Sequence, residues 1–338
     1  MTDAVPDAVR NSWSPSAAIL VATDLNDLDR LMPFALEQAA ETGARLLLLH
    51  VLASGMGMAI DAAGLPYYDP AAALEFATKT LEPWCAVAQH KGIQCDALVR
   101  EGHAAKQIAA ALRQFQADRV LLGTRSRSKL GKLLLGSVAE QVLRSVNLPV
   151  ITVGPEAHLA VDAKQRVVLH ATTLREASIP SAALACQIAA NQGAKLVVLH
   201  VLPPEEEPGG FKSFTGKTGR SGQPASLDSA ALHELSVLAA QAGASCCSAI
   251  EPRVVHGNAS IEILAAAVEC RASLIVLAAT ERSIFQTLAR DRTIYRVLAH
   301  ARCPVLTLRE PRANLDAEGR EAGSGFIWSE GNKEETRQ

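Results

Sequence analysis

The segment LLLLHVL at residues 46–52 returns as LVVLHVL at residues 196–202, so part of this chain occurs twice. Two further segments repeat in the same order. EGHAAKQIAAAL at 101–112 returns as HGNASIEILAAA at 256–267, and NLPVITV at 147–153 returns as RCPVLTL at 302–308. Three ordered matches at nearly constant spacing predict two tandem homologous domains, the number also expected for a chain of 338 residues.

Each copy alternates apolar strands with helices. In the first copy, strands are expected at 17–23, 44–52, 93–100, 118–123 and 149–153, and helices at 27–42, 70–91, 104–116 and 137–145. Continuous apolar strands between helices are typical of a parallel sheet that is covered on both faces. This order predicts two doubly wound α/β domains, each with a five-stranded parallel sheet, at residues 16–155 and 164–310. Residues 1–15 and 311–338 are expected to be disordered, and 203–228 to be a flexible insertion.

Composition argues against several classes of protein. The formal net charge of −2 lacks the basic excess of a general nucleic-acid binder. No apolar run reaches the roughly 18–20 residues that span a membrane, and the first residues do not form a secretory signal. Seven cysteines without a C-x-x-C pair indicate reduced thiols in a cytoplasmic protein. A Cys246–Cys247 redox pair is disfavoured, because neighbouring side chains of a strand point to opposite faces.

A second segment, GTRSRSKLGKLLLGSVAE at 123–140, bears on function. Gly123 closes an apolar strand, a basic loop that includes Arg125 follows, and Gly136 with Ser137 opens a helix. Free N–H groups at a helix N-terminus bind anions, and the Ser137 hydroxyl can donate to a phosphate oxygen. The alternative needs no ligand, because SVAE fits a capping box with Ser137 as N-cap and Glu140 answering it. Local chemistry leaves both interpretations open.

The same segment resembles the signature of the universal stress protein family, in which Gly, two residues, Gly, nine residues and Gly precede Ser or Thr. ILVATD at 19–24, LLLLHV at 46–51 and LPVITV at 148–153 fit the rest of the family's pattern, and the similarity extends over both repeats. In nucleotide-binding members the aspartate meets the adenosine end, backbone groups after the second strand contact the base, and the glycine loop wraps the phosphates. The resemblance therefore implies a nucleotide site formed by Asp24, Val51, Gly123, Ser126, Gly136, Ser137 and Val138, with Arg125 beside it.

Two departures from the family's pattern matter. Ser126 stands where the family has its second glycine. A positive φ at this position would strain a serine, and its Cβ would crowd a bound phosphate. Its hydroxyl, however, could donate a hydrogen bond to that phosphate. In the second copy, the repeat spacing places Ala278, Glu281, Asp291 and Arg292 at the positions of Gly123, Ser126, Gly136 and Ser137, and Thr172 or Thr173 at that of Asp24. Carboxylates repel phosphates, so the second copy is expected to bind no nucleotide.

These observations predict a cytoplasmic tandem universal stress protein. Its first domain binds ATP or a related adenine nucleotide, with Mg as a candidate companion, and its second domain is a degenerate scaffold. The role is regulatory or in the stress response, with a protein partner that the sequence does not identify. No general base or metal-ligand set is apparent, so slow ATP hydrolysis is the most catalysis expected. The alternatives are an interaction protein that binds no nucleotide, and a slow ATPase.

Other polar signals receive structural interpretations. GGFKSFTGKTG at 209–219 has the wrong spacing for a Walker A loop. His50 and His200 are expected to fill structural hydrogen bonds, and His103 and Asn258 to cap helices. The last strands of the copies, 149–153 and 304–308, begin with proline and are expected at sheet edges. We expect them to pair in one chain as an intramolecular pseudo-dimer, and the isolated first domain to form homodimers.

Overall fold

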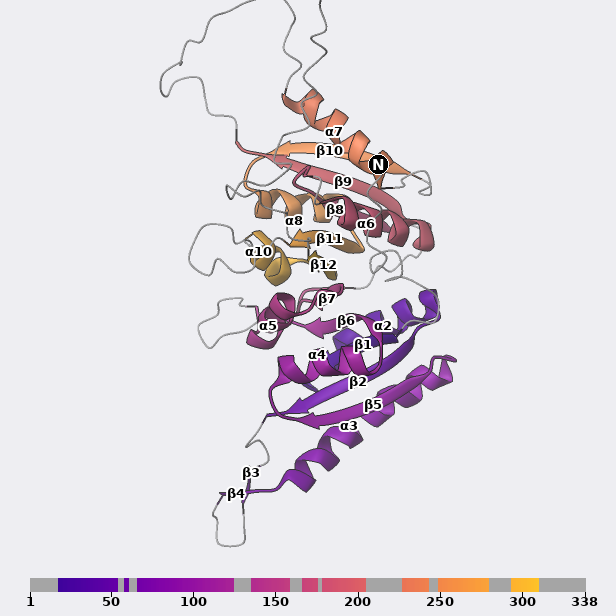
Figure 1. Ribbon diagram of the computed structural model, residues 1–338, viewed down its shortest axis with the longest axis vertical. Coiled ribbons are helices and arrows are strands. Elements are labelled where there is room, and N and C mark those ends of the chain that lie inside the picture. Colours follow the sequence, from indigo (N-terminus) through magenta and orange to yellow (C-terminus); the bar gives the residue numbers. More distant parts are fainter. Residues whose placement is uncertain are drawn as a thin grey trace, which may run out of the picture.

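A computed structural model describes residues 18–53, 58–60, 66–124, 135–158, 166–175, 178–204, 227–242, 249–279 and 293–309. The two terminal segments expected to be disordered, most of the 203–228 insertion and the Cys246–Cys247 pair lie outside these ranges. Figure 1 shows the two copies stacked along the long axis of the molecule, with the first copy (indigo to magenta) at one end and the second (rose through orange to yellow) at the other.

The first copy follows the expected alternation. Its elements are β1 (Ala18–Thr23), α2 (Leu28–Thr42), β2 (Arg45–Leu52), α3 (Pro70–His90), β5 (Cys95–Glu101), α4 (Ala104–Gln114), β6 (Ala117–Gly123), α5 (Ser137–Ser145) and β7 (Val150–Val153). An antiparallel hairpin of β3 (Met58–Ile60) and β4 (Pro66–Tyr68), which periodicity did not predict, lies between β2 and α3. Local chemistry fixes the helix ends: Asp69 accepts a hydrogen bond from the Ala72 N–H at the start of α3, and α2 ends at Gly43, whose φ is +68°.

The second copy repeats this order without a described hairpin. Its elements are β8 (Val167–Ala171), α6 (Ile179–Gln192), β9 (Lys195–Leu202), α7 (Leu227–Gln241), β10 (Ile250–His256), α8 (Ala259–Glu269), β11 (Leu274–Ala279), α10 (Thr293–His300) and β12 (Val305–Arg309). β8 and β11 are buried along most of their length, as are the equivalent strands β1 and β6 of the first copy. This burial explains their continuous apolar runs.

The strands of both copies form one ten-stranded sheet in the order β10-β9-β8-β11-β12-β7-β6-β1-β2-β5. Within this ten-stranded sheet, strand pairs inside each copy are parallel, as the doubly wound fold requires, and the junction of β7 with β12 is antiparallel. Ile151 lies opposite Leu306, its own equivalent in the repeat. The expected pairing of the two last strands is therefore present, and each of these strands ends the sheet of its copy.

Helices cover both faces of this sheet, and each layer runs through the junction (Figure 1). One buried apolar cluster contains side chains of α2, α3, α6 and α7, and the other contains side chains of α4, α5, α8 and α10. Each cluster joins residues of both copies, such as Leu31 with Leu184 on one face and Ile108 with Ile263 on the other. The two copies thus share a continuous core on each side.

Polar contacts also cross the junction. The guanidinium of Arg166 forms ion pairs with Glu37 and Glu41 of α2. On the other face, Arg309 donates to the Arg144 carbonyl and to the Asn147 side chain, at 3.1 Å in both cases. These contacts connect the last turn of α5 to β12 and the start of the second copy to α2.

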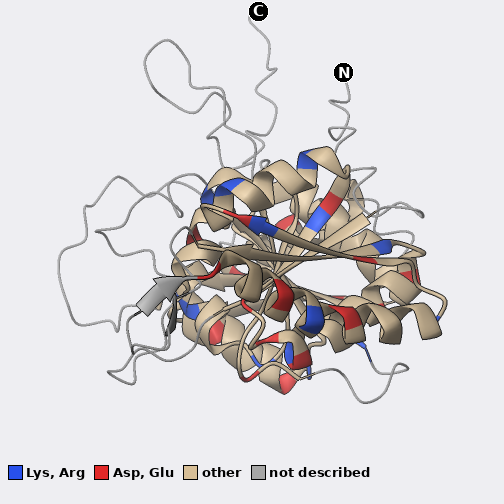
Figure 2. Ribbon diagram, turned by 90° about the horizontal axis from the view of Figure 1, so that it is seen from below, with Lys and Arg blue, Asp and Glu red and all other residues tan. Residues whose placement is uncertain are grey.

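Charged residues are dispersed over the outside. Figure 2 shows Lys and Arg interspersed with Asp and Glu along the helices, while the central strands are largely free of charge. This distribution agrees with the formal net charge of −2. Among the helices that the structure describes, none combines the length and the apolar character needed to cross a bilayer.

Candidate functional site

The candidate site lies where the strand order of the first copy reverses, at the carboxyl ends of β1 and β6. Thr23, which ends β1, pairs with His50 of β2, so Asp24, just after β1, and Val51, near the end of β2, lie at the same edge of the sheet. Gly123 ends β6, the other neighbour of β1. The fold therefore brings Asp24, Val51 and Gly123 to one edge, the place where ligands bind in open α/β sheets.

A tight turn presents Asp24 at this edge. The Leu25 N–H donates to the Thr23 hydroxyl at 2.9 Å, and the Asn26 N–H donates to the Asp24 carboxylate at 3.0 Å. Leu25 is held at a φ of +72°, a conformation that is strained for a leucine. The half-buried Asp24 carboxylate is thus oriented by its own backbone at the mouth of the site.

Asp27, which the sequence analysis did not select, is the buried acid of this site. Its carboxylate accepts a 2.6 Å hydrogen bond from the Thr23 hydroxyl and lies against Gly123. A Cβ at Gly123 would overlap the Asp27 Oδ2 atom and lie 3.1 Å from its Cγ. The glycine is therefore required by the neighbouring carboxylate, whatever a ligand requires. Burial raises the pKa of the Asp27 carboxyl above its usual range, although the Thr23 hydrogen bond opposes the rise.

The signal that could have found Asp27 is its position at the N-cap of α2, three residues after the Asp that the family pattern picks out. That reasoning predicts only that Asp27 caps the N-terminus of α2. Its side chain makes no capping hydrogen bond and turns to the strand ends instead, which is visible only in three dimensions.

The N-terminus of α5 supplies the second half of the candidate site. Gly136 is the N-cap and has no side chain to satisfy the first N–H groups, and Ser137 and Val138 occupy the first turn with exposed side chains. The capping box was therefore wrong: Ser137 lies inside the helix, and Glu140 pairs with Arg144 at 2.6 Å. Because α5 runs back between two parallel strands, its first turn faces the carboxyl edge of the sheet. First-turn N–H groups without helical acceptors form an anion site.

The remaining predicted site residues, Arg125 and Ser126, lie outside the described part of the chain, so the serine that replaces the second glycine stays a prediction. Within the described residues, no group of three or more His, Cys, Asp or Glu side chains is arranged to hold a metal ion. A magnesium ion at this site would depend on oxygen atoms of the nucleotide phosphates.

The histidines occupy structural positions. His50 Nδ1 lies 2.9 Å from the Thr23 carbonyl oxygen, and His200 Nδ1 lies 2.9 Å from the Thr172 carbonyl oxygen. The expected structural hydrogen bonds are thus confirmed in both copies. Capping is confirmed for Asn258, which accepts from the Ser260 N–H, and is wrong for His103, whose side chain makes no capping hydrogen bond.

The second copy retains the turn and loses the acid. Thr172 takes the place of Thr23, accepting from the Leu174 N–H at 3.3 Å, and Leu174 has a φ of +58°. Thr173 therefore stands where Asp24 stands, and its hydroxyl lies 3.2 Å from that of Ser178. Register places Ala278 at the position of Gly123, while Glu281, Asp291 and Arg292 lie outside the described residues. The leucine turn is therefore structural, because it persists where Asp24 does not.

Comparison with known proteins agrees with this geometry. The model of the universal stress protein family matches residues 17–154 and 165–309. This chain belongs to the universal stress protein family. The two matches cover the two structural repeats, so the protein is a tandem member of that family.

Individual relatives fit the same assignment. A universal stress protein from Thermus aquaticus is 32% identical over 139 residues, which are 40% of this chain and 96% of that protein. The crystal structure of one from Archaeoglobus fulgidus matches 89% of this chain and 98% of its own, at 21% identity and a TM-score of 0.66, and so shares the two-copy fold. Another from Archaeoglobus fulgidus, solved in complex with dAMP, is 21% identical over 40% of this chain and 96% of its own, with a TM-score of 0.31.

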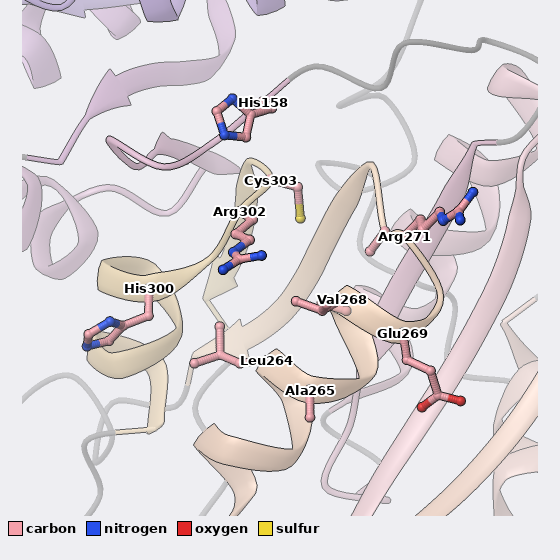
Figure 3. Close-up of a pocket in the computed structure, with 11 residues that line it drawn as sticks. His158, Leu264, Ala265, Val268, Glu269, Arg271, His300, Arg302 and Cys303 are labelled. Carbon is pink, nitrogen blue, oxygen red and sulfur yellow. The ribbon is translucent and has the colours of Figure 1, made fainter.

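This universal stress protein also has a pocket of about 770 Å³ in its second copy, away from the candidate site (Figure 3). Its lining comes from α8, from the segments that precede β11 and β12, and from His158 of the linker: Leu264, Val268, Arg271, His300 and Arg302 are among the residues. Arg271 and Arg302 precede their strands, so this pocket lies at the amino ends of parallel strands. Nucleotide sites of doubly wound folds lie at the opposite edge.

Proposed function

We propose that the first domain binds an adenine nucleotide, with ATP as the ligand, at the carboxyl ends of β1, β2 and β6. The observation that carries this proposal is the uncapped N-terminus of α5 at the same sheet edge as Asp24 and Gly123. A helix whose N-cap is a glycine has no capping side chain at that position, which leaves its first N–H donors for a ligand. The protein then acts as a regulatory binding protein of the stress response.

Charge supports one orientation of the nucleotide. The carboxylates of Asp24 and Asp27 gather at the end of β1 and would repel phosphates, but Asp24 can accept hydrogen bonds from ribose hydroxyls. The positive end of the α5 dipole and the Ser137 hydroxyl suit the phosphates instead. The adenosine therefore lies over β1 and β2, with Val51 beside the base, and the phosphates lie at α5.

We further propose that the second domain is a scaffold without nucleotide, because Thr173 and Ala278 replace the acid and the glycine of the first site. ATP hydrolysis is at most slow, since Asp27 and His50, the buried titratable groups of the described site, make structural hydrogen bonds. The cytoplasm suits the free cysteines of the described chain, which a reducing compartment maintains.

The competing function is an interaction protein of the same fold that binds no nucleotide. The observation that favours it is the Asp27 carboxylate, which fills the space beside Gly123 that a phosphate could otherwise approach. Thermal unfolding of the full chain with and without ATP–Mg separates the two. Ligand at about 100 times its Kd should stabilise the folded state by about 2.7 kcal/mol and raise the Tm.

A matched pair of variants tests the location. Gly136→Asp places a carboxylate at the α5 anion site, where the helix dipole tolerates it, and should abolish the Tm increase. Asn258→Asp places a carboxylate at a helix N-cap of the second copy, that of α8, and should retain it. A wild-type Tm that ATP–Mg leaves unchanged would support the interaction protein, and an equal increase in folded Gly136→Asp would move the site elsewhere.

A further inference from the structure

Two buried cysteines touch in the first copy. The Sγ atoms of Cys85, in α3, and Cys95, at the start of β5, lie 2.6 Å apart. Non-bonded carbon atoms rest at about 3.5–4.0 Å, and sulfur is larger, so this is an unusually close approach for two thiols. Cys85 is 7% exposed and Cys95 is 6% exposed, and both belong to the apolar cluster under α3.

The local fold forces this contact. α3 ends at His90, the chain turns through Gly92 at a φ of +76°, and β5 begins at Cys95. Ile93 N–H donates to the Ala88 carbonyl at 3.0 Å, which holds the turn against the last turn of the helix. Cys85 and Cys95 are ten residues apart, and each is held in place by a helix or a strand. Their side chains therefore enter the same apolar cluster under α3.

The environment distinguishes the two sulfurs. The pKa of the Cys85 thiol is lowered by its hydrogen bond with Cys95, although burial opposes the change. The pKa of the Cys95 thiol is raised, first by this hydrogen bond and then by burial. Because the two sulfur atoms are in contact, either thiol is positioned to attack the other after oxidation, and the direction of the pKa shifts favours Cys85 as the first nucleophile.

We propose that Cys85 and Cys95 form an oxidisable dithiol, which hydrogen peroxide converts to an intramolecular disulfide between α3 and β5. The Cys85 thiolate attacks one peroxide oxygen, the O–O bond breaks, and the departing hydroxide takes a proton to become water. The sulfur of Cys95 then attacks the sulfenic sulfur of Cys85, forming the S–S bond and breaking the S–O bond. The second hydroxide leaves with the Cys95 proton, so two thiols lose two electrons and two protons and the peroxide becomes two waters.

The bond would fasten the C-terminal end of α3 to the edge strand β5. β5 is the last strand of the sheet on the first-copy side and pairs only with β2 among the described strands. A covalent link across this turn restricts opening of the edge in the oxidised form, so the Tm should rise on oxidation and return on reduction. The contact lies away from the carboxyl edge, because Cys95 begins its strand, and the proposal does not depend on nucleotide binding.

Peptide mass analysis of the full chain tests the proposal directly. The reduced protein, freed of reductant, is treated with hydrogen peroxide, alkylated and digested with trypsin without reductant. Cleavage after Lys79, Lys91 and Arg100 separates the two cysteines into peptides 80–91 and 92–100. The expected product is this pair of peptides joined by a disulfide, lighter by two hydrogens than their sum, and converted to two alkylated peptides by dithiothreitol.

Three variants provide controls. Cys85→Ser and Cys95→Ser should each lose the linked peptides and the Tm change on oxidation, while Cys303→Ser, which removes an equally buried cysteine, should keep both. The wild-type measurement stands alone if a variant does not fold. Recovery of both peptides unlinked after peroxide, or linkage of Cys85 or Cys95 only to other cysteines, would overturn the proposal.

Discussion

At the scale of single residues, Gly123 and Asp27 form a packed pair at the end of β6. The glycine is not in a left-handed conformation, so its lack of a side chain answers a steric need. The Asp27 carboxylate fills that space while its other oxygen accepts from Thr23. A residue that the family pattern assigns to phosphate binding is thus also part of the fold.

Gly123→Ala should lower the free energy of unfolding by about 1–3 kcal/mol, because its Cβ displaces a buried, hydrogen-bonded carboxylate. Gly154→Ala is the matched control, since a Cβ there meets nothing closer than 3.5 Å, and it should cost little. Urea unfolding measures both variants. The double variant Gly123→Ala/Asp27→Ala should lose less unfolding free energy than the sum of the losses in the two single variants. Additive costs would show that the two residues do not interact.

His170 gives a pH dependence with a definite sign. It is completely buried, its Nδ1 lies 3.2 Å from the Val276 carbonyl oxygen, and burial lowers its pKa to about 4. The unfolded chain binds a proton below about pH 6.5 and the folded chain does not, so stability is lost as the pH falls from 6.5 towards 4.

The first copy suggests the substitution His170→Val, because Val21 occupies the position of β1 that corresponds to His170 in β8. Between pH 7 and pH 5, the wild type should lose about 2 kcal/mol more unfolding free energy than His170→Val. Urea unfolding at the two pH values measures the difference. Equal losses in both proteins would mean that His170 is protonated in the folded state.

At the scale of elements, periodicity and helix-end residues predicted the main strands and helices of the first copy within a few residues. The β3–β4 hairpin was not predicted, because its three-residue strands are too short to show a period. The start of α5 was predicted, but its capping was not. SVAE satisfies the capping-box pattern one residue too late, since the backbone of Gly136 takes the N-cap position.

The second copy makes charged contacts with α2 through Arg166, and Gln192 of α6 also donates to the Glu41 carboxylate at 2.8 Å. Arg166 pairs with Glu37 and Glu41, and these three side chains are 13%, 26% and 17% exposed. Arg166→Ala should lower the free energy of unfolding by about 1–3 kcal/mol, because it leaves two half-buried carboxylates facing each other. Lys79→Ala removes an exposed pair with Glu75 and should change stability by no more than about 0.5 kcal/mol.

The Arg166→Ala deficit should also depend on pH. Burial already raises the pKa of Glu37 and Arg166 lowers it, so the variant raises it further. Protonation then removes the repulsion between the two carboxyls, and the deficit should shrink as the pH falls through the carboxyl range. Urea unfolding at pH 7 and pH 4.5 measures this, and a deficit of the same size at both would contradict an electrostatic origin.

At the scale of the whole molecule, the two copies meet through equivalent residues. Ile151 faces Leu306, and the Tyr295 hydroxyl lies 3.5 Å from the carboxylate of Glu140, its equivalent in the repeat. Contacts between equivalents are the mark of a twofold interface, here formed within one chain. The repeats in the sequence predicted this junction; the acid beside Gly123 could not be predicted, because it depends on how β1, α2 and β6 meet.

The isolated first domain, residues 1–163, should therefore form homodimers through β7, with a second copy replacing the missing half. Sedimentation velocity of the purified domain, shown to be folded by circular dichroism, should give a dimer at high concentration. Ile151→Pro should weaken the dimer by removing an N–H from the pairing strand. A folded domain that stays monomeric at every concentration would contradict the predicted dimer.

Calorimetric titration of the full chain with ATP–Mg tests the central claim most directly. The first copy has Asp24, Gly123 and the uncapped helix at one sheet edge, while the second has Thr173 and Ala278 at the corresponding positions. The predicted result is a single binding event with a stoichiometry near one nucleotide per chain. Two equivalent sites would contradict the assignment of nucleotide to the first copy, and the absence of any binding heat at several temperatures would contradict nucleotide binding itself.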